Sequence, residues 1–325
     1  MSAAGPAFFP SGAFHLRTPL LPFETLAAFG AGLGAAGALD DPQRLEEALA
    51  ADRERQRRWL RELVERPEIR EALFVASPDL DDALPAWLDD PDGERGQRVE
   101  RALVRYLSRA AGRSTPFGLF AGASVGRIGG ATRLVLEGRE AGGRHSRLDM
   151  DYLFALVDAL MRDPARRAEF VLTPNSSLYG RAEGFRYVES RLKGEDRTYH
   201  LVALEDSPAL RETLARAAGG ARAADLAAAL VEPDVSIEEA AEYVGHLVEA
   251  QILVPDLGMT VTGPEPTASL AARLAEGAAT VAIAQELARA ESALEALDAG
   301  WTGAPPARYR AVSEGLAKLP SQPDH

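Results

Sequence analysis

A row of arginines runs up to a threonine-containing turn in the middle of the chain. The stretch RYLSRAAGRSTPFGLFAG carries Arg105, Arg109 and Arg113 at four-residue spacing. In a helix this spacing places the three side chains along one face, and Arg98 and Arg101 extend the same row. Guanidinium groups bind phosphate through paired hydrogen bonds, so such a row could follow a nucleic-acid backbone.

An ordinary solvated helix face is the alternative interpretation of the row. The chain has 49 acidic residues, which could pair with the arginines at the surface. Exposed pairs of this kind contribute at most about 1 kcal/mol each. Lysine is nearly absent, with only Lys193 and Lys318, so the use of arginine is partly a compositional habit. Both interpretations of the row stay open on the residues alone.

The turn after the row supplies a hydroxyl group. Thr115 precedes Pro116, and a residue before proline is pushed out of the helical region. We therefore expect the helix over 94–112 to stop there and to leave the Thr115 hydroxyl free near the last arginines. Gly118 and Gly122 then allow the backbone to approach closely.

Two glycine-containing motifs resemble catalytic signatures without the elements that these signatures need. GLGAAG at 32–37 fits the dinucleotide pattern G-x-G-x-x-G, but a proline-broken and then helix-like segment precedes it instead of a strand. GASVG at 122–126 fits G-x-S-x-G, but a strand-like run follows where a helix is required. We interpret the first motif as a helix end or loop and Ser124 as a strand or turn serine.

Composition narrows the class of protein. The chain has 325 residues, 46% of them hydrophobic, and a formal net charge of −13, which suits a cytoplasmic protein of two or three domains. The lack of cysteine excludes disulfides and thiolate chemistry, and the five scattered histidines give no metal-site spacing. From the histidine spacing we expect no metal site. We find no apolar run of about 18 residues and no secretory signal, so we expect no membrane span.

The hydrophobic pattern predicts an α+β fold of mixed helices and small sheets. Before residue 150 we expect a strand at HLRTPLLP, helices over 42–65 and 94–112, and a strand pair over 117–137. RLDMDYLFALVDALMRD reads as a helix opened by acidic residues.

A different pattern begins near residue 169. Three short strands (EFVLTPNSSLYG, GFRYVESRL and RTYHLVAL) are followed by three helices and the apolar strand ILV. This order is typical of a winged helix-turn-helix. Residues 268–299 read as helix with a break at Gly277. We predict three parts: an N-terminal part at 1–150, a winged-helix-like element at 151–263 and an Ala/Glu-rich helical segment at 264–325.

The run SRAAGRSTPFGLFAGASVG resembles the signature of the lantibiotic dehydratase family, in its N-terminal glutamylating region. HLRTPLLPFETL, ALFVASPDLDDAL, RLDMDYL and LTPNSSLYGRAEGFRY resemble other family segments in the same order, and LVEAQILVPDLGMTVTG resembles the close of the family's peptide-recognition element. The resemblance runs from about Arg17 to about Gly263.

The resemblance implies an enzyme that uses glutamyl-tRNA to esterify Ser and Thr side chains of a ribosomal precursor peptide, after which glutamate is eliminated. Glutamyl-tRNA is a co-substrate, and no cofactor is implied. Thr115 and Asp149 are carried over as catalytic residues, with Asp149 preferred to Asp151. The residues carried over for tRNA and glutamyl binding are Arg17, Arg105, Arg109 and Arg113.

The resemblance also implies that the winged-helix element binds the leader of the precursor peptide. The leader would add a strand at GFRYVES or TYHLVAL and pack against the helix SIEEAAEYVGHLVEA. The expected contact residues are Phe185, Tyr187, Val244, Leu247 and Val248. A DNA-binding winged helix is the alternative, but the third helix carries four glutamates and no arginine or lysine, so phosphates would repel it.

One departure from the family concerns length. Members are far longer, and glutamate elimination resides in a separate region toward the C-terminus. We therefore expect this chain to be incomplete as an enzyme: a fragment, a subunit of a split enzyme, or a remnant that only binds leader or tRNA. The expected partners are the leader, tRNA-Glu and a protein with the remaining glutamylation or elimination domain. A homodimer and a peptide aminoacyl-tRNA ligase also stay open.

Overall fold

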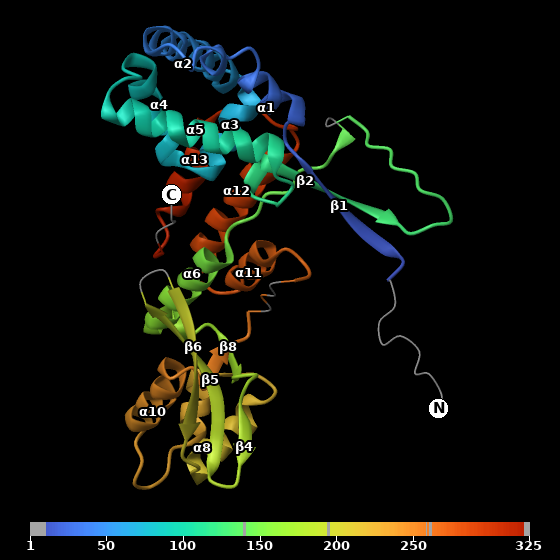
Figure 1. Ribbon diagram of the computed structural model, residues 1–325. Coiled ribbons are helices and arrows are strands. Elements are labelled where there is room, and N and C mark those ends of the chain that lie inside the picture. Colours follow the sequence, from blue (N-terminus) through green and yellow to red (C-terminus); the bar gives the residue numbers. More distant parts are fainter. Residues whose placement is uncertain (1–10, 139–140, 194–195, 258, 260–261, 322–325) are drawn as a thin grey trace. The chain divides into compact units, whose positions relative to one another are not determined.

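Helices alternate with short antiparallel strands along the chain, as the computed structural model in Figure 1 shows. The structure describes residues 11–138, 141–193, 196–257, 259 and 262–321. Contacts divide the chain into two units: Met1–His145 with Ala296–Ala311, and Ser146–Glu295 with Val312–Asp324. Mixed helices and small antiparallel sheets confirm the predicted α+β class.

Helices make up most of the first unit. Those that begin and end within it are α1 (Phe23–Gly30), α2 (Pro42–Val64), α3 (Pro67–Ala76), α4 (Pro78–Asp89), α5 (Glu94–Gly112) and the short 3₁₀ turns η1 (Ala35–Gly37) and η2 (Gly118–Phe120). α2, α3 and α4 each start with proline, whose fixed φ suits the first helical position. Trp87, Leu103 and Phe120 lie in their common core.

A two-stranded ribbon extends from these helices (Figure 1). β1 (Ala13–Pro19) pairs antiparallel with β2 (Ala121–Arg127), from Ala13 opposite Arg127 to Pro19 opposite Ala121. The strand predicted at HLRTPLLP is confirmed, but the strand pair predicted over 117–137 is wrong. The glycine-rich segment after β2 forms no strand in its described part, because β2 finds its partner near the N-terminus instead.

Residues 164–257 supply two small sheets and four helices in the second unit. The strands are β3 (Val171–Pro174), β4 (Tyr179–Arg181), β5 (Gly184–Lys193), β6 (Asp196–Leu204), β7 (Ala221–Arg222) and β8 (Leu253–Pro255). The helices are α7 (Pro164–Arg167), α8 (Pro208–Ala217), α9 (Ala223–Ala229) and α10 (Ile237–Glu249). One sheet has the order β7-β3-β8 and the other β4-β5-β6. The predicted order of short strands, then α8, α9 and α10, and then the closing strand β8 is confirmed; α7 and β7 were not predicted.

A hydrophobic core of the second unit lies around α6 (Met150–Arg162). α11 (Pro266–Leu274) and α12 (Val281–Asp298) contribute to it, and Gly277 lies between them, at the predicted break. α13 (Pro306–Leu316) follows, within the segment predicted to be helical, although no separate helix was predicted there. The segment 264–325 divides between the two units, since Ala296–Ala311 belongs to the first; the three-part functional division stays a prediction.

Candidate functional site

The arginine row lies on α5, as predicted. The helix forms because Val99, Leu103 and Leu107 recur every four residues and bury one face in the core. The arginines line the remaining, solvent-facing side. α5 ends at Gly112, and Arg113 already has extended backbone angles (φ −126°, ψ 125°), so the row runs off the helix into the turn.

Most of the row has no acidic partner within the described ranges. Arg98 makes an exposed ion pair with Glu94, with a nitrogen–oxygen distance of 3.4 Å. Arg101, Arg105 and Arg113 are exposed, and no ion pair joins them to an acid among the described residues. Within the described part of the chain, the surface pairing that would make this an ordinary solvated face is therefore seen only at Arg98. The other exposed members keep their charge available to an anion.

Arg109 differs from its neighbours because an aromatic ring covers it. Its guanidinium carbon lies 4.2 Å from the centre of the Phe117 ring. Its Nε is buried without a hydrogen-bond partner in the described part of the chain. Phe117 also stacks with the fully buried Phe120, at 6.3 Å between ring centres, and Phe120 stacks with Tyr106 at 5.5 Å. The rings thus connect Arg109 to the core of the unit.

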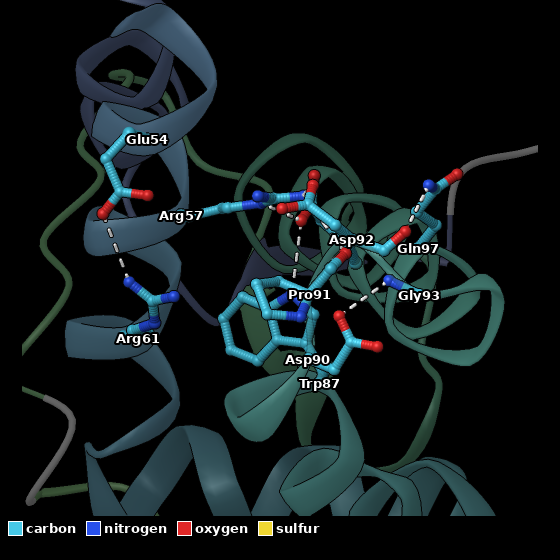
Figure 2. Close-up of polar contacts among 10 residues, drawn as sticks. Glu54, Arg57, Arg61, Trp87, Asp90, Pro91, Asp92, Gly93 and Gln97 are labelled. Atoms are coloured by element: carbon cyan, nitrogen blue, oxygen red, sulfur yellow. Dashed lines mark hydrogen bonds and ion pairs between the residues drawn. The ribbon is translucent and has the colours of Figure 1, made fainter. Parts of the chain in front are cut away.

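Arg57 shows what a structural arginine of this unit looks like (Figure 2). From α2 its Nε donates to Glu100 at 2.7 Å, while one terminal nitrogen donates to Asp92 at 2.9 Å and to the Pro91 carbonyl at 3.1 Å. Glu100 also accepts from the Trp87 indole. Two carboxylates neutralise this buried guanidinium, and it fastens the loop before α5. None of the arginines later in α5 has such a set of partners within the described ranges.

The turn after α5 presents Thr115 to solvent, as predicted. Gly118 has a φ of +49°, and a side chain there would approach Val75 at 3.3 Å, which explains glycine at this position. Arg17 is exposed on β1, opposite Ala123 of β2. The structure thus places Arg17, Thr115 and the arginine row in the same unit.

The end of β1 is tied to the end of α5. The Leu20 amide donates to the Phe120 carbonyl at 2.9 Å, and the Leu21 amide donates to the Ala110 carbonyl at 2.8 Å. The strand that carries Arg17 is therefore anchored beside the last turn of the arginine helix.

A buried polar cluster in this unit escaped the sequence analysis. The Glu71 side chain is fully buried and accepts from Arg144, from the Tyr309 hydroxyl and from the Gly303 amide, each at 2.6 Å. Arg144 also reaches Asp298 at 3.1 Å. Burial and the bond to Glu71 raise the pKa of the Tyr309 hydroxyl well above its usual range, so it remains a donor. No local pattern links residues so distant in sequence.

This cluster fixes the loop that carries Trp301. A cavity of about 810 Å³ is lined by Trp301 and Thr302 together with Pro19, Phe23 and Arg66. Trp301 and Thr302 also line a cavity of about 860 Å³ that runs along β1 and β2. The C-terminal segment, to which the sequence analysis assigned no chemistry, therefore forms part of the walls beside the predicted site.

Asp149 caps a helix in the second unit. Its carboxylate accepts from the Asp151 amide at 2.8 Å at the N-terminus of α6. This contact is a sufficient structural reason for an aspartate here, because a capping side chain satisfies a free amide. A role in transfer stays a prediction for this residue.

The residues predicted to contact a leader lie mainly in the core of the second unit. Tyr187, Val244, Leu247 and Val248 are buried, with Val244 only 1% exposed, and Phe185 is half-buried against them. They pack the sheet against α10 instead of forming a surface. A direct leader contact stays a prediction for them, and exposed side chains are better placed to make it.

Side chains seal one edge of β5. Beyond β4, the Val188 amide donates to Ser177 Oγ at 2.8 Å and the Val188 carbonyl accepts from Asn175 at 3.2 Å. The side chain of Gln251 pairs with the backbone of Ser190: its Oε1 accepts from the Ser190 backbone N–H at 2.9 Å, and its Nε2 donates to the Ser190 carbonyl at 2.7 Å. Gln251 adopts a φ of 58° to reach this place. β5 is thus central, and β6 is an edge strand whose neighbour in the sheet is β5.

An apolar row lies on the outer face of this sheet. Val188 pairs with Leu201 and Ser190 with Tyr199, so these side chains point to the face opposite Tyr187. Leu201 is 58% exposed and Tyr199 is 69% exposed. Tyr199 also lines a cavity of about 550 Å³. Of the two edges proposed for a leader, TYHLVAL is the one that remains open.

Searches for two other kinds of site give no candidate in the described part of the chain. No group of three metal-ligating side chains occurs there. None of the described helices is long and apolar enough to cross a membrane.

Comparison with known proteins gives the family. The family profile described as "Lantibiotic dehydratase, N terminus" matches residues 65–325. The chain belongs to this family. The lantibiotic dehydratase resemblance drawn from the sequence is thereby confirmed.

Three relatives show how far this likeness to lantibiotic dehydratases extends. The chain is 27% identical over 207 residues to the subtilin biosynthesis protein SpaB of Bacillus subtilis, covering 59% of this chain and 18% of that protein. The tRNA-dependent lantibiotic dehydratase MibB from Microbispora sp. 107891 has a similar fold, with a TM-score of 0.66, 21% identity and coverage of 95% of this chain and 27% of that one.

The glutamylation domain of TbtB from thiomuracin biosynthesis, bound to 5'-phosphodesmethylglutamycin, gives a TM-score of 0.51 at 21% identity, over 85% of this chain and 33% of that one. The chain therefore spans between 18% and 33% of the length of these relatives.

Proposed function

We propose that the chain is the N-terminal part of an enzyme that transfers glutamate from glutamyl-tRNA to Ser and Thr side chains of a precursor peptide, ahead of dehydration. The peptide hydroxyl oxygen attacks the acyl carbon of the aminoacyl ester, and the ribose oxygen leaves with the proton. The ester is already activated, so the protein mainly binds the RNA, orients the hydroxyl and stabilises charge on the acyl oxygen. Membership of the lantibiotic dehydratase family supports this proposal.

The observation that carries the proposal is the arginine row before Thr115, most of which has no acidic partner among the described residues. Arg101, Arg105 and Arg113 keep their positive charge on a chain whose net charge is −13. A basic strip on an acidic protein concentrates a polyanion at one place. We assign Arg105, Arg109 and Arg113 to phosphates of the acceptor end.

The turn and its surroundings would act on the glutamyl ester. We assign Thr115 to orient the ester beside the arginine row, since its exposed hydroxyl can donate and accept. Arg17 on the neighbouring ribbon would bind the glutamyl carboxylate or a phosphate. Asp149, taken from the family resemblance, would bind the glutamyl amine or assist proton transfer.

Titrations of tRNA-Glu at several salt concentrations test the row. Arg105→Ala and Arg113→Ala should each weaken binding and reduce the slope of log affinity against log salt by about one unit, since each neutralised phosphate releases a counterion. Arg216→Ala is the matched control, because Arg216 is an exposed arginine of the second unit paired with Glu212. Unchanged RNA affinity in a folded Arg105→Ala/Arg113→Ala variant would remove this helix from the tRNA site.

Thr115→Ala separates binding from transfer. The substitution removes a hydroxyl and no charge, so affinity for tRNA-Glu should stay the same while glutamyl transfer to the peptide falls. Equal loss of both would show that Thr115 acts through the shape of the turn.

A leader-peptide-binding module is the second candidate function. We propose that residues 164–257 form a winged-helix-like element in which an extended leader adds to the open edge of β6. The sealed edge of β5 and the exposed Tyr199 and Leu201 on the strand favour this place. The acidic α10 argues against DNA, because phosphates would be repelled.

Two substitutions to glutamate distinguish surface from core in this element. Leu201→Glu should weaken binding of a synthetic leader without changing thermal stability, since the side chain is exposed. Val244→Glu should unfold the element, because burying an unpaired carboxylate costs several kcal/mol. Leader affinity and circular dichroism measured on both variants check this. Unchanged leader binding in Leu201→Glu would move the leader away from the outer face of β6.

Completion of the reaction would need a further polypeptide region. We propose the leader, tRNA-Glu and a protein or domain with the remaining glutamylation and elimination functions as partners in the cytoplasm. A peptide aminoacyl-tRNA ligase remains an alternative for the transfer. Incubating the chain with a co-encoded peptide and aminoacyl-tRNAs, with and without a neighbouring gene product, and weighing the peptide product distinguishes these cases.

A further inference from the structure

The Arg109 guanidinium is held against the Phe117 ring and not by an ion pair among the described residues. Arg109 is the half-buried member of the row, and no acid pairs with it in the described part of the chain. Its buried Nε has no hydrogen-bond partner among the residues that the structure describes. An arginine needed only for stability would be expected to resemble Arg57, whose Nε and one of whose terminal nitrogens donate to oxygens (Figure 2).

An aromatic partner and an acidic partner have different consequences for an arginine. A carboxylate fixes the side chain but cancels its charge. A ring fixes the guanidinium through its face and leaves the net charge unchanged. Ordering a free arginine upon binding costs rotamer entropy, and a side chain that is already ordered avoids this cost.

The partly exposed Phe117 ring is supported by other aromatic rings. Phe117 has extended backbone angles (φ −165°, ψ 103°) directly after Pro116. It stacks with the buried Phe120 at an interplanar angle of 14°, and Phe120 stacks with Tyr106 of α5 at 18°. Tyr106 and Arg109 therefore lie one helical turn apart and both connect to the same ring system. A shift of the turn after α5 would therefore move the Phe117 ring away from Arg109.

We propose that Phe117 is a positioning residue that orders Arg109 for a phosphate group of the bound RNA. The inference rests on the proposed function, because it requires that Arg109 contact tRNA. Phe117 itself need not touch the RNA. Its contribution lies in the free protein, where stacking selects the rotamer of Arg109 that the complex uses.

This role predicts an unusual signature in binding. Phe117→Leu should weaken affinity for unacylated tRNA-Glu by about 2- to 25-fold, the range that a cation–π contact supports. The salt dependence should stay the same, because Arg109 still reaches the phosphate and still releases a counterion. Arg109→Ala should weaken binding and reduce the slope by about one unit. Phe117→Tyr should keep wild-type affinity.

A double-mutant cycle completes the test on the full chain. Phe117→Leu should have no further effect in an Arg109→Ala background, since the group that it positions is gone. Phe29→Leu is the matched control for a phenylalanine-to-leucine change in the same unit, because the half-buried Phe29 ring packs against Trp59, away from the arginine row.

The outcomes separate the two proposals. If Arg109→Ala leaves tRNA affinity unchanged, Arg109 is not in the RNA site and both the contact and its positioning are overturned. If Arg109→Ala weakens binding but Phe117→Leu does not, the tRNA site stands and the positioning role is overturned. A reduced slope in Phe117→Leu, or additive effects in the cycle, would show that Phe117 acts on the RNA independently and would also overturn it.

Discussion

The buried Glu71 cluster allows a quantitative prediction about stability. Glu71 is fully buried and accepts three hydrogen bonds, from Arg144, Tyr309 and Gly303. Glu71→Gln keeps the size of the side chain but leaves the buried Arg144 with Asp298 as its remaining carboxylate partner among the described residues. Removing one member of a buried ion pair costs about 3–5 kcal/mol, and the retained amide places this change near 3 kcal/mol.

The expected effect is large enough to measure in a thermal melt. For a unit of about 150–250 residues, 1 kcal/mol shifts the melting temperature by about 2–4 °C, so Glu71→Gln should lower it by about 6–12 °C. All three tryptophans of the chain, Trp59, Trp87 and Trp301, belong to the first unit, so tryptophan fluorescence follows its unfolding.

Glu68→Gln is the control for this prediction, because Glu68 pairs with Arg66 at the surface, where such pairs contribute at most about 1 kcal/mol. A Glu71→Gln protein that melts within about 1 °C of wild type would refute the claim that the cluster anchors residues 296–311 to α3.

Two further predictions concern residues outside the candidate site. The amides of Gly34 and Ala35 donate to the Asp52 carboxylate and lower its pKa. The contribution of Asp52 to stability is therefore present above its ordinary pKa and is lost as the pH falls through its lowered pKa. In acid titrations followed by fluorescence, Asp52→Asn should show a smaller loss of stability than wild type below about pH 4. Gln251→Ala should destabilise the second unit more than Gln251→Gly, by about 1–2 kcal/mol in denaturant melts followed by circular dichroism, because both lose the bonds to Ser190 but only alanine is strained at a φ of 58°. Equal stability of the two variants would contradict the strain at this position.

Local pattern was sufficient for most of the helices and for the turn after α5. The apolar four-residue repeat predicted α5 to its last residue, and the proline after Thr115 predicted where it stops. The two glycine motifs were also judged correctly: GLGAAG lies in the loop and 3₁₀ turn before α2, and Ser124 lies within β2. Helices depend on neighbours three and four residues away, so their signals are contained in a short window.

Strand pairing depends on parts of the chain that are distant in sequence. β2 was predicted, but its partner was placed in the segment that follows it, whereas the structure pairs it with β1, more than a hundred residues earlier. A strand's alternation shows that it needs a partner and does not show which strand provides it. The same limitation left two candidate edges for the leader, until the side chains of Asn175, Ser177 and Gln251 were seen to seal β5.

The sequence by itself determined the family, the α+β class and the position of a basic helix beside a threonine turn, because each depends on residues close together in the chain. Only the tertiary structure decided which arginines of the row lack an acidic partner in the described part of the chain, that Phe117 covers Arg109, and that Glu71 anchors a loop more than two hundred residues away. Pairing, burial and preorganisation depend on which distant side chains become neighbours, and that is settled by packing the whole chain.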